Sequence, residues 1–272
     1  MVVDLGGGTV DITCNEVLES KKLREVYNAS GGPWGGNMIN QRIWKHIRTL
    51  FGNRPFDEFI KENTDCHIDL LKAIEEAKMN MKPNQNSVIR IPDHIFEVCT
   101  YDSNNAEIDG GKRRLVLSSD TVVKVFEACC AEVCRHLKNV LERKENVHIK
   151  TMLLVGGYSA CEMLKDGIKT AFPTIHMISP VDSPQTIVLR GAVLMGHESR
   201  PIVRRIAKYH YMLSKPHGLR ILSKSTTQQD AILDDELLYL PLINKGDPIS
   251  IGNRVAQYSF HVESENLQDT EI

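Results

Sequence analysis

Apolar and polar residues alternate through the first segment of the chain, as expected of β-strands. The alternation over residues 2–14 is interrupted by a run of three glycines, which predicts a strand, a tight turn and a second strand. Residues 18–29 continue the alternation around a turn at Lys21-Lys22. The pattern therefore predicts a sheet in which glycine makes the first connection.

Three later segments repeat apolar residues at helical spacing. A first helix follows a second glycine cluster at residues 31–36, and its apolar face consists of Met38, Ile39, Ile43, Ile47 and Leu50. A second helix over residues 68–82 ends at Pro83, and its apolar face consists of Ile68, Leu71 and Ile74. A third helix runs from a cap at Ser118 or Ser119 to about Arg143, and its buried face consists of Val122, Phe126, Val133, Leu137 and Leu141.

A buried strand and a last helix complete the predicted core. The continuous apolar run of residues 151–155 is typical of a strand covered on both faces, and Gly156-Gly157 ends it before a further helix. A strand near residues 175–179 precedes a helix that extends through Ala192. Since residues 87–117 have the pattern of short strands joined by polar turns, the order of elements predicts an α/β core with an inserted α+β subdomain over about residues 31–112.

The pattern changes after residue 197. Residues 204–213 and 255–262 alternate, and Gly246-Asp247-Pro248 predicts a turn between strands. We therefore expect a first domain over residues 1–197 and a small antiparallel β module over residues 198–272.

Composition and charge exclude several classes of protein. The 33 basic and 35 acidic side chains give a net charge of −2, so we expect no nucleic-acid partner of the kind that needs a basic stripe. No apolar run approaches the roughly 18 residues that span a bilayer, which predicts no membrane span. The seven cysteines are odd in number and scattered, which favours the reducing cytoplasm over secretion. The strand pattern begins at Met1 without a signal peptide, and this abrupt start predicts a fragment or a partial gene product.

The strongest chemical motif is Asp4-Leu5-Gly6-Gly7-Gly8-Thr9-Val10-Asp11. Consecutive glycines let peptide N–H groups approach an anion without a Cβ in the way. Asp4 is placed to hold a hydrated magnesium ion beside a phosphate chain, and Thr9 to bond a terminal phosphate or an attacking water. An ordinary hairpin turn is the alternative, but it needs only one or two glycines. A dinucleotide fingerprint and a P-loop are both rejected, because a strand follows and no Gly-Lys-Ser/Thr occurs.

Two weaker motifs follow. The strand that ends at Gly156-Gly157 lets a flat ligand lie against bare backbone, although an ordinary strand-to-helix turn explains it equally well. Glu75 and Lys78 lie three residues apart on one helical face and are spaced to hold ribose hydroxyls, although a solvated pair is the favoured explanation for this spacing alone.

Taken in order, these three motifs resemble the second lobe of the ATPase domain of the seventy-kilodalton heat-shock protein family, which belongs to the actin and sugar-kinase superfamily. The resemblance covers about residues 1–197, and the glycine cluster at residues 31–36 is most similar to the divergent member-twelve branch, forms A and B. It implies an actin-like, ribonuclease-H-like ATPase lobe with an inserted α+β subdomain. The tail loosely resembles the start of the β module that binds client peptides in this family.

The resemblance implies a chaperone-like protein that binds ATP or ADP with magnesium. Asp4 would hold the magnesium through water and, together with Thr9, would be catalytic. The nucleotide-binding residues that it implies are Gly6, Gly7, Gly8 and Thr9 at the phosphates, Asp11 in support of this loop, Gly35 and Gly36 from the inserted subdomain, Glu75 and Lys78 at the ribose, and Gly156, Gly157 and Tyr158 under the adenosine and the α-phosphate. Its partners would be the nucleotide and client or regulatory proteins.

The chain also departs from the family pattern. The family holds adenine between two arginines, and the matching positions are Met79 and Ala160, so this cation–π clamp is missing. The acidic residue expected at position 185 is Gln185. No second Asp-x-Gly-x-x hairpin occurs, so we expect one lobe that is inactive by itself. The leading hypothesis is the ATP-binding half of a chaperone-like ATPase; a pseudo-ATPase scaffold without turnover is the alternative, and a small-molecule kinase of the same superfamily is a weaker third.

Overall fold

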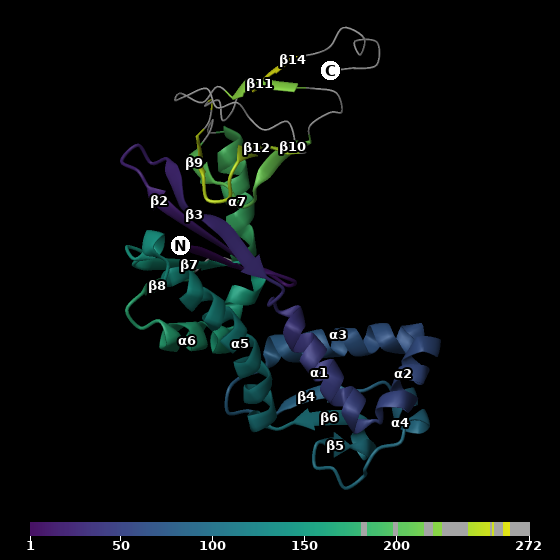
Figure 1. The fold of residues 1–272 in the computed structure, drawn as a ribbon. Helices are drawn as coiled ribbons and strands as arrows, with labels where there is room; N and C mark the ends of the chain where they lie inside the picture. The colour runs from purple at the N-terminus through teal and green to yellow at the C-terminus, as the bar shows by residue number, and fades with distance from the viewer. Residues whose placement is uncertain are drawn as a thin grey trace. The chain divides into compact units, whose positions relative to one another are not determined.

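The computed structural model describes residues 1–180, 184–197, 201–214, 220–224, 239–250, 252 and 258–261 (Figure 1). Its packing divides the chain into two compact units. The first comprises Met1–Ile12 and Ser30–Leu194, and the second comprises Thr13–Ala29 and Met195–Ile272. The boundary at residue 197 that the sequence suggests stays a prediction.

The first unit contains three strands of a mixed sheet in the order β1-β7-β8, and their bounds are Val2–Leu5 for β1, Thr151–Val155 for β7 and His176–Ile178 for β8. Most of β2 (Val10–Val17) and of its neighbour β3 (Leu23–Gly32) belongs to the second unit. Strand β1 is parallel to β7, and Asp4 is the register partner of Val155. Because parallel strands end at the same edge of a sheet, the loops that follow β1 and β7 emerge side by side.

Helices α5 (Ser119–Leu141) and α6 (Glu162–Ala171) lie side by side next to β7 and β8 (Figure 1). The predicted cap of α5 is confirmed at Ser118, whose hydroxyl accepts the N–H of Thr121 at 3.2 Å. The predicted stripe is confirmed except at its end, where Val140 is buried and Leu141 is half-buried. The four-then-three spacing of the buried positions 133, 137 and 140 explains this difference. The last helix of the core is α7 (Pro184–His197).

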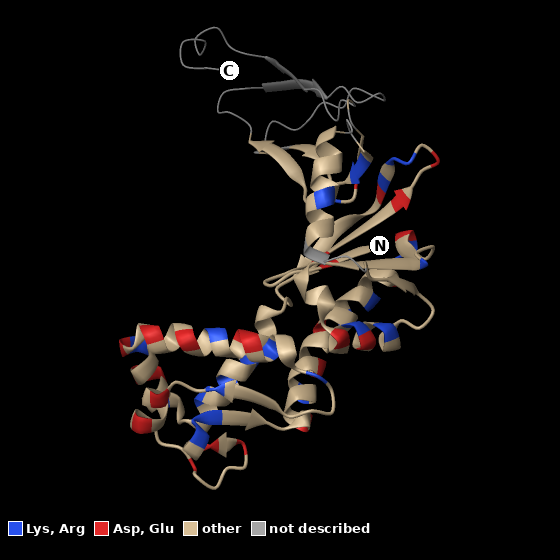
Figure 2. Cartoon of the chain, turned by 180° about the vertical axis from the view of Figure 1, so that it is seen from behind, with Lys and Arg blue, Asp and Glu red and all other residues tan. Residues whose placement is uncertain are grey.

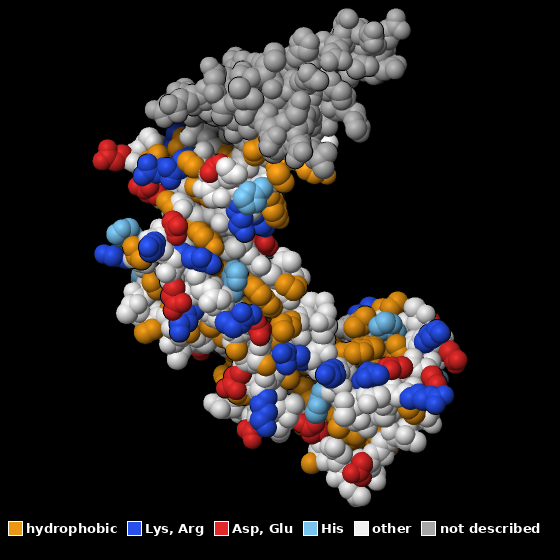
Figure 3. Space-filling model, viewed as in Figure 1, with side chains coloured by type: hydrophobic (Ala, Val, Ile, Leu, Met, Phe, Trp, Pro, Cys, Tyr) orange, Lys and Arg blue, Asp and Glu red, His pale blue; other side chains and the backbone are white. Residues whose placement is uncertain are grey.

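The inserted subdomain consists of four helices around a small antiparallel sheet of order β4-β6-β5 (Figure 1). Its elements are α1 (Asn37–Leu50), α2 (Asn53–Glu62), α3 (Thr64–Asn80), β4 (Ser87–Arg90), α4 (Asp93–Val98), β5 (Ile108–Asp109) and β6 (Arg114–Leu117). The short helices α2 and α4 were not predicted. Basic and acidic side chains are interspersed over this subdomain on the face shown in Figure 3.

The apolar face predicted for the second helix is partly wrong. Ile74 is buried as expected, but Ile68 and Leu71 are 45% and 43% exposed. The other buried positions of α3 are Leu70 and Ala77. The face that packs therefore follows an i, i+4, i+7 series, whereas the predicted i, i+3, i+6 series rotates away from it.

The second unit is built from short strands. Strand β9 (Ile202–Ile206) pairs in parallel with β3 and antiparallel with β13 (Pro248–Ser250). The carboxylate of buried Glu25 accepts the N–H of Ile206 at 2.7 Å. The small antiparallel sheets of the prediction are present as the pairs β10 (Tyr211–Ser214) with β12 (Tyr239–Ile243), and β11 (Arg220–Lys224) with β14 (Tyr258–His261).

Two of the predicted strands differ in extent. The alternating segment 204–213 is divided between β9 and β10. Of the segment 255–262, residues 258–261 form β14, and positions 255–257 and 262 lie outside the described residues. Within the described ranges, no helix combines the length and the apolar character that a membrane crossing requires.

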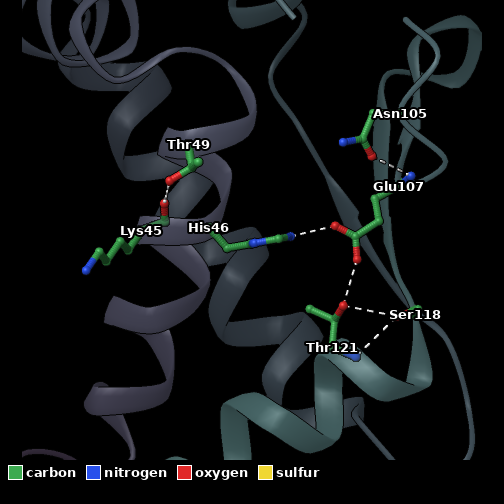
Figure 4. Close-up of polar contacts among 7 residues, drawn as sticks. All are labelled: Lys45, His46, Thr49, Asn105, Glu107, Ser118 and Thr121. Carbon is green, nitrogen blue, oxygen red and sulfur yellow. Dashed lines mark hydrogen bonds and ion pairs between the residues drawn. The ribbon is translucent and has the colours of Figure 1, made fainter. Parts of the chain in front are cut away.

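A half-buried carboxylate, that of Glu107, joins the loop before β5 to helices α1 and α5 (Figure 4). Glu107 Oε2 lies 2.6 Å from His46 Nε2 of α1, and Glu107 Oε1 accepts the hydroxyl of Thr121, in the first turn of α5, at 2.8 Å. The N–H of Glu107 donates to Asn105 Oδ1 at 2.9 Å. Only 18% of the Glu107 side chain is exposed, so this contact is shielded from water.

Changing Glu107 to glutamine is expected to lower the free energy of unfolding by about 1 kcal/mol at neutral pH, because it removes charge-assisted hydrogen bonds. Urea unfolding of Glu107→Gln and of a control, Glu97→Gln, measures this. Glu97 is exposed on α4, so its replacement should change little. Equal stability of the two variants would contradict the expected role of Glu107.

The same carboxylate makes the effect dependent on pH. Burial alone would raise the pKa of Glu107, but hydrogen bonds from His46 and Thr121, together with the charge of His46 and the N–H of Ser118, lower it below its ordinary value of 4.5. The contribution of Glu107 to stability is therefore complete above the unfolded-state pKa and is lost as the pH falls through the lower folded-state value. The difference between Glu107→Gln and the parent should shrink over that acidic range.

Candidate functional site

The glycine loop after β1 is a tight, exposed turn. The N–H of Gly6 donates to the carbonyl of Thr9 at 2.9 Å and closes the turn. Gly7 and Gly8 are exposed, and a Cβ at either would meet no atom within 4 Å. Their N–H groups have no acceptor in the described part of the chain. Successive N–H groups of this kind form a concave site for an anion.

The second glycine cluster holds this loop by its carbonyl groups. The N–H groups at the start of α1 donate to the loop carbonyls in three bonds: Gly35 to Gly8 at 3.3 Å, Gly36 to Gly6 at 3.1 Å and Asn37 to Gly7 at 2.7 Å. In a trans peptide the C=O and the N–H point in opposite directions. Because the carbonyls of Gly6 and Gly7 face α1, the N–H groups of Gly7 and Gly8 face away from it.

These hydrogen bonds indicate that the second glycine cluster positions the glycine loop. The N–H groups of Gly35 and Gly36 donate to carbonyls of the glycine loop, and these hydrogen bonds hold the loop in place. Gly35 is buried against the loop, and a Cβ there would lie 2.6 Å from the carbonyl oxygen of Gly6. Direct contact of the two glycines with phosphate stays a prediction.

The loop after β7 meets the end of β1, as the parallel register requires. Gly156 has φ +85°, and a Cβ there would lie 2.3 Å from Asp4 Oδ1. The carboxylate of Asp4 therefore rests against bare backbone at the carboxyl edge of the sheet. A short 3-10 turn, Gly157–Ala160, follows and leads into α6.

The acidic residues of the loop lie near one another. Partial burial, and secondly the charge of Asp11, raise the pKa of Asp4. The hydroxyl of Thr9 donates to Asp11 Oδ2 at 2.9 Å, and neither residue lines the cavity described next. No group of three or more metal-ligating side chains occurs among the described residues. Magnesium keeps most of its waters and uses one or two carboxylates beside phosphate, so the donor set present here fits it.

A cavity of about 630 Å³ opens beside the loop. Six residues predicted from the sequence line it: Gly7, Gly36, Glu75, Lys78, Gly157 and Tyr158. Met79 and Ala160, the positions that match the missing arginine clamp, line it as well. The structure thus brings the three motifs of the sequence to one cavity, while Asp4, Gly6, Gly8, Thr9, Asp11, Gly35 and Gly156 lie outside its lining.

Lys78 and Glu75 form a hydrogen-bonded pair on the wall of this cavity. Lys78 Nζ and Asn40 Nδ2 each donate to Glu75 Oε2 at 2.6 Å. Burial alone would raise the pKa of Glu75, but the bonds from Lys78 and Asn40 lower it. The Lys78 side chain is only 13% exposed, which does not agree with a pair that is simply solvated.

Tyr158 gives the cavity a buried aromatic wall. Tyr158 is 8% exposed, and its buried hydroxyl has no hydrogen-bond partner among the residues that the structure describes. Burial, and secondly the neighbouring cysteines, raise the pKa of Tyr158, so the phenol is neutral. Sequence reasoning missed Phe126 and Cys161, which also line the cavity. Phe126 was visible only as part of the apolar stripe of α5, and no pattern indicated Cys161.

The sheet, its glycine hairpin and the inserted subdomain together define the α/β lobe of an actin-like ATPase, followed by small antiparallel sheets. A family profile described as "Hsp70 protein" matches residues 1–205. The chain belongs to the Hsp70 family.

Individual relatives place the chain with a divergent branch of this family. It is 29% identical over 222 residues to Heat shock 70 kDa protein 12A of Mus musculus, covering 75% of this chain and 33% of that protein. It is 26% identical over 213 residues to Heat shock 70 kDa protein 12B of Homo sapiens, covering 72% and 31%. Chaperone protein DnaK of Prochlorococcus marinus (strain MIT 9515) is 26% identical over 204 residues, covering 72% and 29%. The chain thus spans about a third of the length of these relatives.

Proposed function

We propose that this chain is the ATP-binding half of a chaperone-like ATPase, with the phosphates held at the glycine loop. Homology to the ATPase domain of the Hsp70 family supports a chaperone-like nucleotide-binding domain. The observation that carries the finer proposal is the pair of N–H groups at Gly7 and Gly8, which have no acceptor among the described residues and border the cavity through Gly7. A loop with free N–H groups suits a phosphate, and the cavity beside it is large enough for a nucleoside.

Each part of the nucleotide has a place in this arrangement. The N–H groups of Gly7 and Gly8 would bond phosphate oxygens, and Lys78 would add a positive charge from the cavity wall. The Glu75 carboxylate, which stays ionised, would accept the ribose hydroxyls. Gly157 and Tyr158 would flank the nucleoside.

Asp4 would hold magnesium through water, because its carboxylate lies at the same sheet edge as the loop. When bound, magnesium supplies positive charge to the phosphate oxygens. Partial burial and the charge of Asp11 raise the pKa of Asp4, and a magnesium ion beside it would lower this pKa by favouring the ionised carboxylate. We also propose catalytic roles for Asp4 and Thr9, which rest on the family resemblance and on the position of Asp4 at the sheet edge.

One observation favours the alternative, a pseudo-ATPase scaffold. Met79 is 77% exposed, and both Met79 and Ala160 line the cavity where the family pattern has arginines. Neither side chain can stack a guanidinium on a base. We therefore expect weak discrimination between adenine and guanine nucleotides. The side chain of Gln185 lies outside the described residues.

Titration calorimetry with Mg-ATP, Mg-ADP and Mg-GTP tests the proposal. Lys78→Met is expected to weaken nucleotide binding about tenfold, because it removes a charged hydrogen-bond donor from the site. Lys72→Met is the matched control, since Lys72 makes the same i, i+3 pair with Asp69 on α3 but is 73% exposed. Asp4→Asn should remove the dependence of binding on magnesium. Equal binding by both lysine variants would exclude this cavity as the nucleotide site.

Client or regulatory proteins and a cytoplasmic location stay predictions from the sequence.

A further inference from the structure

A second cavity, of about 470 Å³, lies on the small sheet of the inserted subdomain. Four basic side chains line it, and we call them the basic cluster: Arg90, Lys112, Arg113 and Arg114. One acidic side chain, Asp93, is also present in the lining. Figure 2 shows basic residues gathered at the adjoining ends of β4 and β6. None of the residues predicted to bind nucleotide contributes to this cavity.

The pairing of the strands places like charges opposite one another. Arg90 of β4 is the register partner of Arg114 of β6 in an antiparallel pair. Arg90 is exposed, whereas its neighbour in the strand, Ile89, is buried against the core on the other face. Like charges that lie directly opposite each other destabilise a sheet. This pair therefore opposes the folding of the sheet that contains it.

Most of the positive charge in the basic cluster is not neutralised by the protein. Arg114 Nε pairs with Asp109 Oδ2 at 3.0 Å. In the part of the chain that the structure describes, Arg90 and Lys112 form no ion pair. The cluster thus presents unpaired cationic groups to the cavity.

Arg113 is held in place by backbone and aromatic contacts. It has φ +50°, in the left-handed region that an arginine rarely occupies, after the short turn Gly110–Lys112. Its guanidinium carbon lies 5.4 Å from the centre of the Phe96 ring. A stacked guanidinium keeps its N–H edge available to an anion.

We propose that this second cavity binds a ligand through clustered phosphate groups. Arginine guanidiniums bond phosphate oxygens in a two-pronged geometry, and three of the four basic side chains are arginines. A polyphosphate would neutralise Arg90, whose charge forms no ion pair among the described residues, whereas Asp109 already pairs with Arg114. The phosphates of a soluble ligand and those of a phosphorylated lipid headgroup present the same chemistry.

Inorganic tripolyphosphate, titrated calorimetrically without magnesium, is the probe for this site. Arg90→Gln is expected to weaken its binding about tenfold, the loss typical of one charged hydrogen-bonding partner. Arg54→Gln makes the same change in net charge at a side chain that is 89% exposed on α2, and it should bind as the parent does. An absence of binding, or equal binding by the two arginine variants, would overturn the proposal.

Two further measurements separate a binding role from a structural one and identify the source of the phosphates. Arg90→Gln is expected to unfold at the temperature of the parent or slightly above it, because it removes like-charge repulsion; a marked decrease would indicate a structural role and count against the proposal. Phosphatidylcholine vesicles that contain a multiply phosphorylated headgroup provide the second arm. Sedimentation of the parent, but not of Arg90→Gln, with these vesicles would support a lipid headgroup, whereas tripolyphosphate binding alone would support a soluble ligand.

Discussion

Replacing Gly35 with alanine is expected to separate the two glycine segments and abolish nucleotide binding. The new Cβ would lie 2.6 Å from both the carbonyl oxygen of Gly6 and the carbonyl carbon of Gly8, and 2.7 Å from the carbonyl carbon of Gly7. These are backbone atoms, which cannot rotate away as a side chain can. Three hydrogen bonds join the segments, so the free energy of unfolding should fall by about 3 kcal/mol.

Gly8→Ala is the control for this substitution. It adds the same methyl group to the partner segment, at a position with no atom within 4 Å. Urea unfolding should therefore show little change for Gly8→Ala and a large loss for Gly35→Ala. Titration with Mg-ATP should show the loss of binding in Gly35→Ala. If Gly35→Ala were as stable as Gly8→Ala, the close contact between the segments would be disproved.

Gly156→Ala is expected to have the second large effect. Its φ of +85° and ψ of 160° lie in a region almost restricted to glycine, which costs a residue with a Cβ about 1–3 kcal/mol. The added atom would also lie 2.5 Å from the carbonyl oxygen of Leu5. Relief of this contact would push the end of β7 away from β1. Asp4 would move with it, because Asp4 Oδ1 would lie 2.3 Å from the new atom.

Gly52→Ala separates the cost of a positive φ from the cost of the steric contact. Gly52 has a similar φ of +77°, but a Cβ there would make only ordinary contacts, the shortest at 3.6 Å. Thermal unfolding of both variants should show a greater loss for Gly156→Ala, and the excess measures the steric contact. Equal losses would mean that the sheet edge at Asp4 tolerates the extra methyl group. Magnesium dependence of nucleotide binding should weaken in Gly156→Ala alone.

Local patterns were sufficient to predict the first hairpin, the strand at residues 151–155 and the long helix, whereas β11 and β12 were not predicted. The glycine triplet fixed the first hairpin, and Ser118 with its apolar stripe fixed the start and the packed face of α5. The face of α3 was harder, because Ile68 and Leu71 are as apolar as the buried Leu70. Two neighbouring faces of α3 are apolar enough to be buried, and the elements that pack against the helix determine which one is.

The site was predictable in its motifs and less so in its connections. Glu75 and Lys78 were named from their helical spacing and Tyr158 from the family resemblance, and all three line one cavity. The hydrogen bonds from Gly35 and Gly36 to the loop carbonyls join two segments that are separated in the chain. The periodic pattern of apolar residues cannot predict such contacts. Phe126 and Cys161 were missed for the same reason, since the lining of a cavity depends on tertiary packing.

The bonds between the start of α1 and the glycine loop have an electrostatic consequence. The peptide units of an α-helix are aligned dipoles with the positive end at the N-terminus. The carbonyls of the peptide groups between Gly6 and Gly8 accept hydrogen bonds from the N-terminus of α1, and the N–H groups of the same peptides point outward. These peptide dipoles are therefore aligned with the dipoles of the helix and extend the row beyond its N-terminus. The positive end of α1 is thereby extended to the surface of the loop by main chain alone. A scan of side chains would leave this charge distribution unchanged, whereas displacing the backbone of residues 35–37 would remove it.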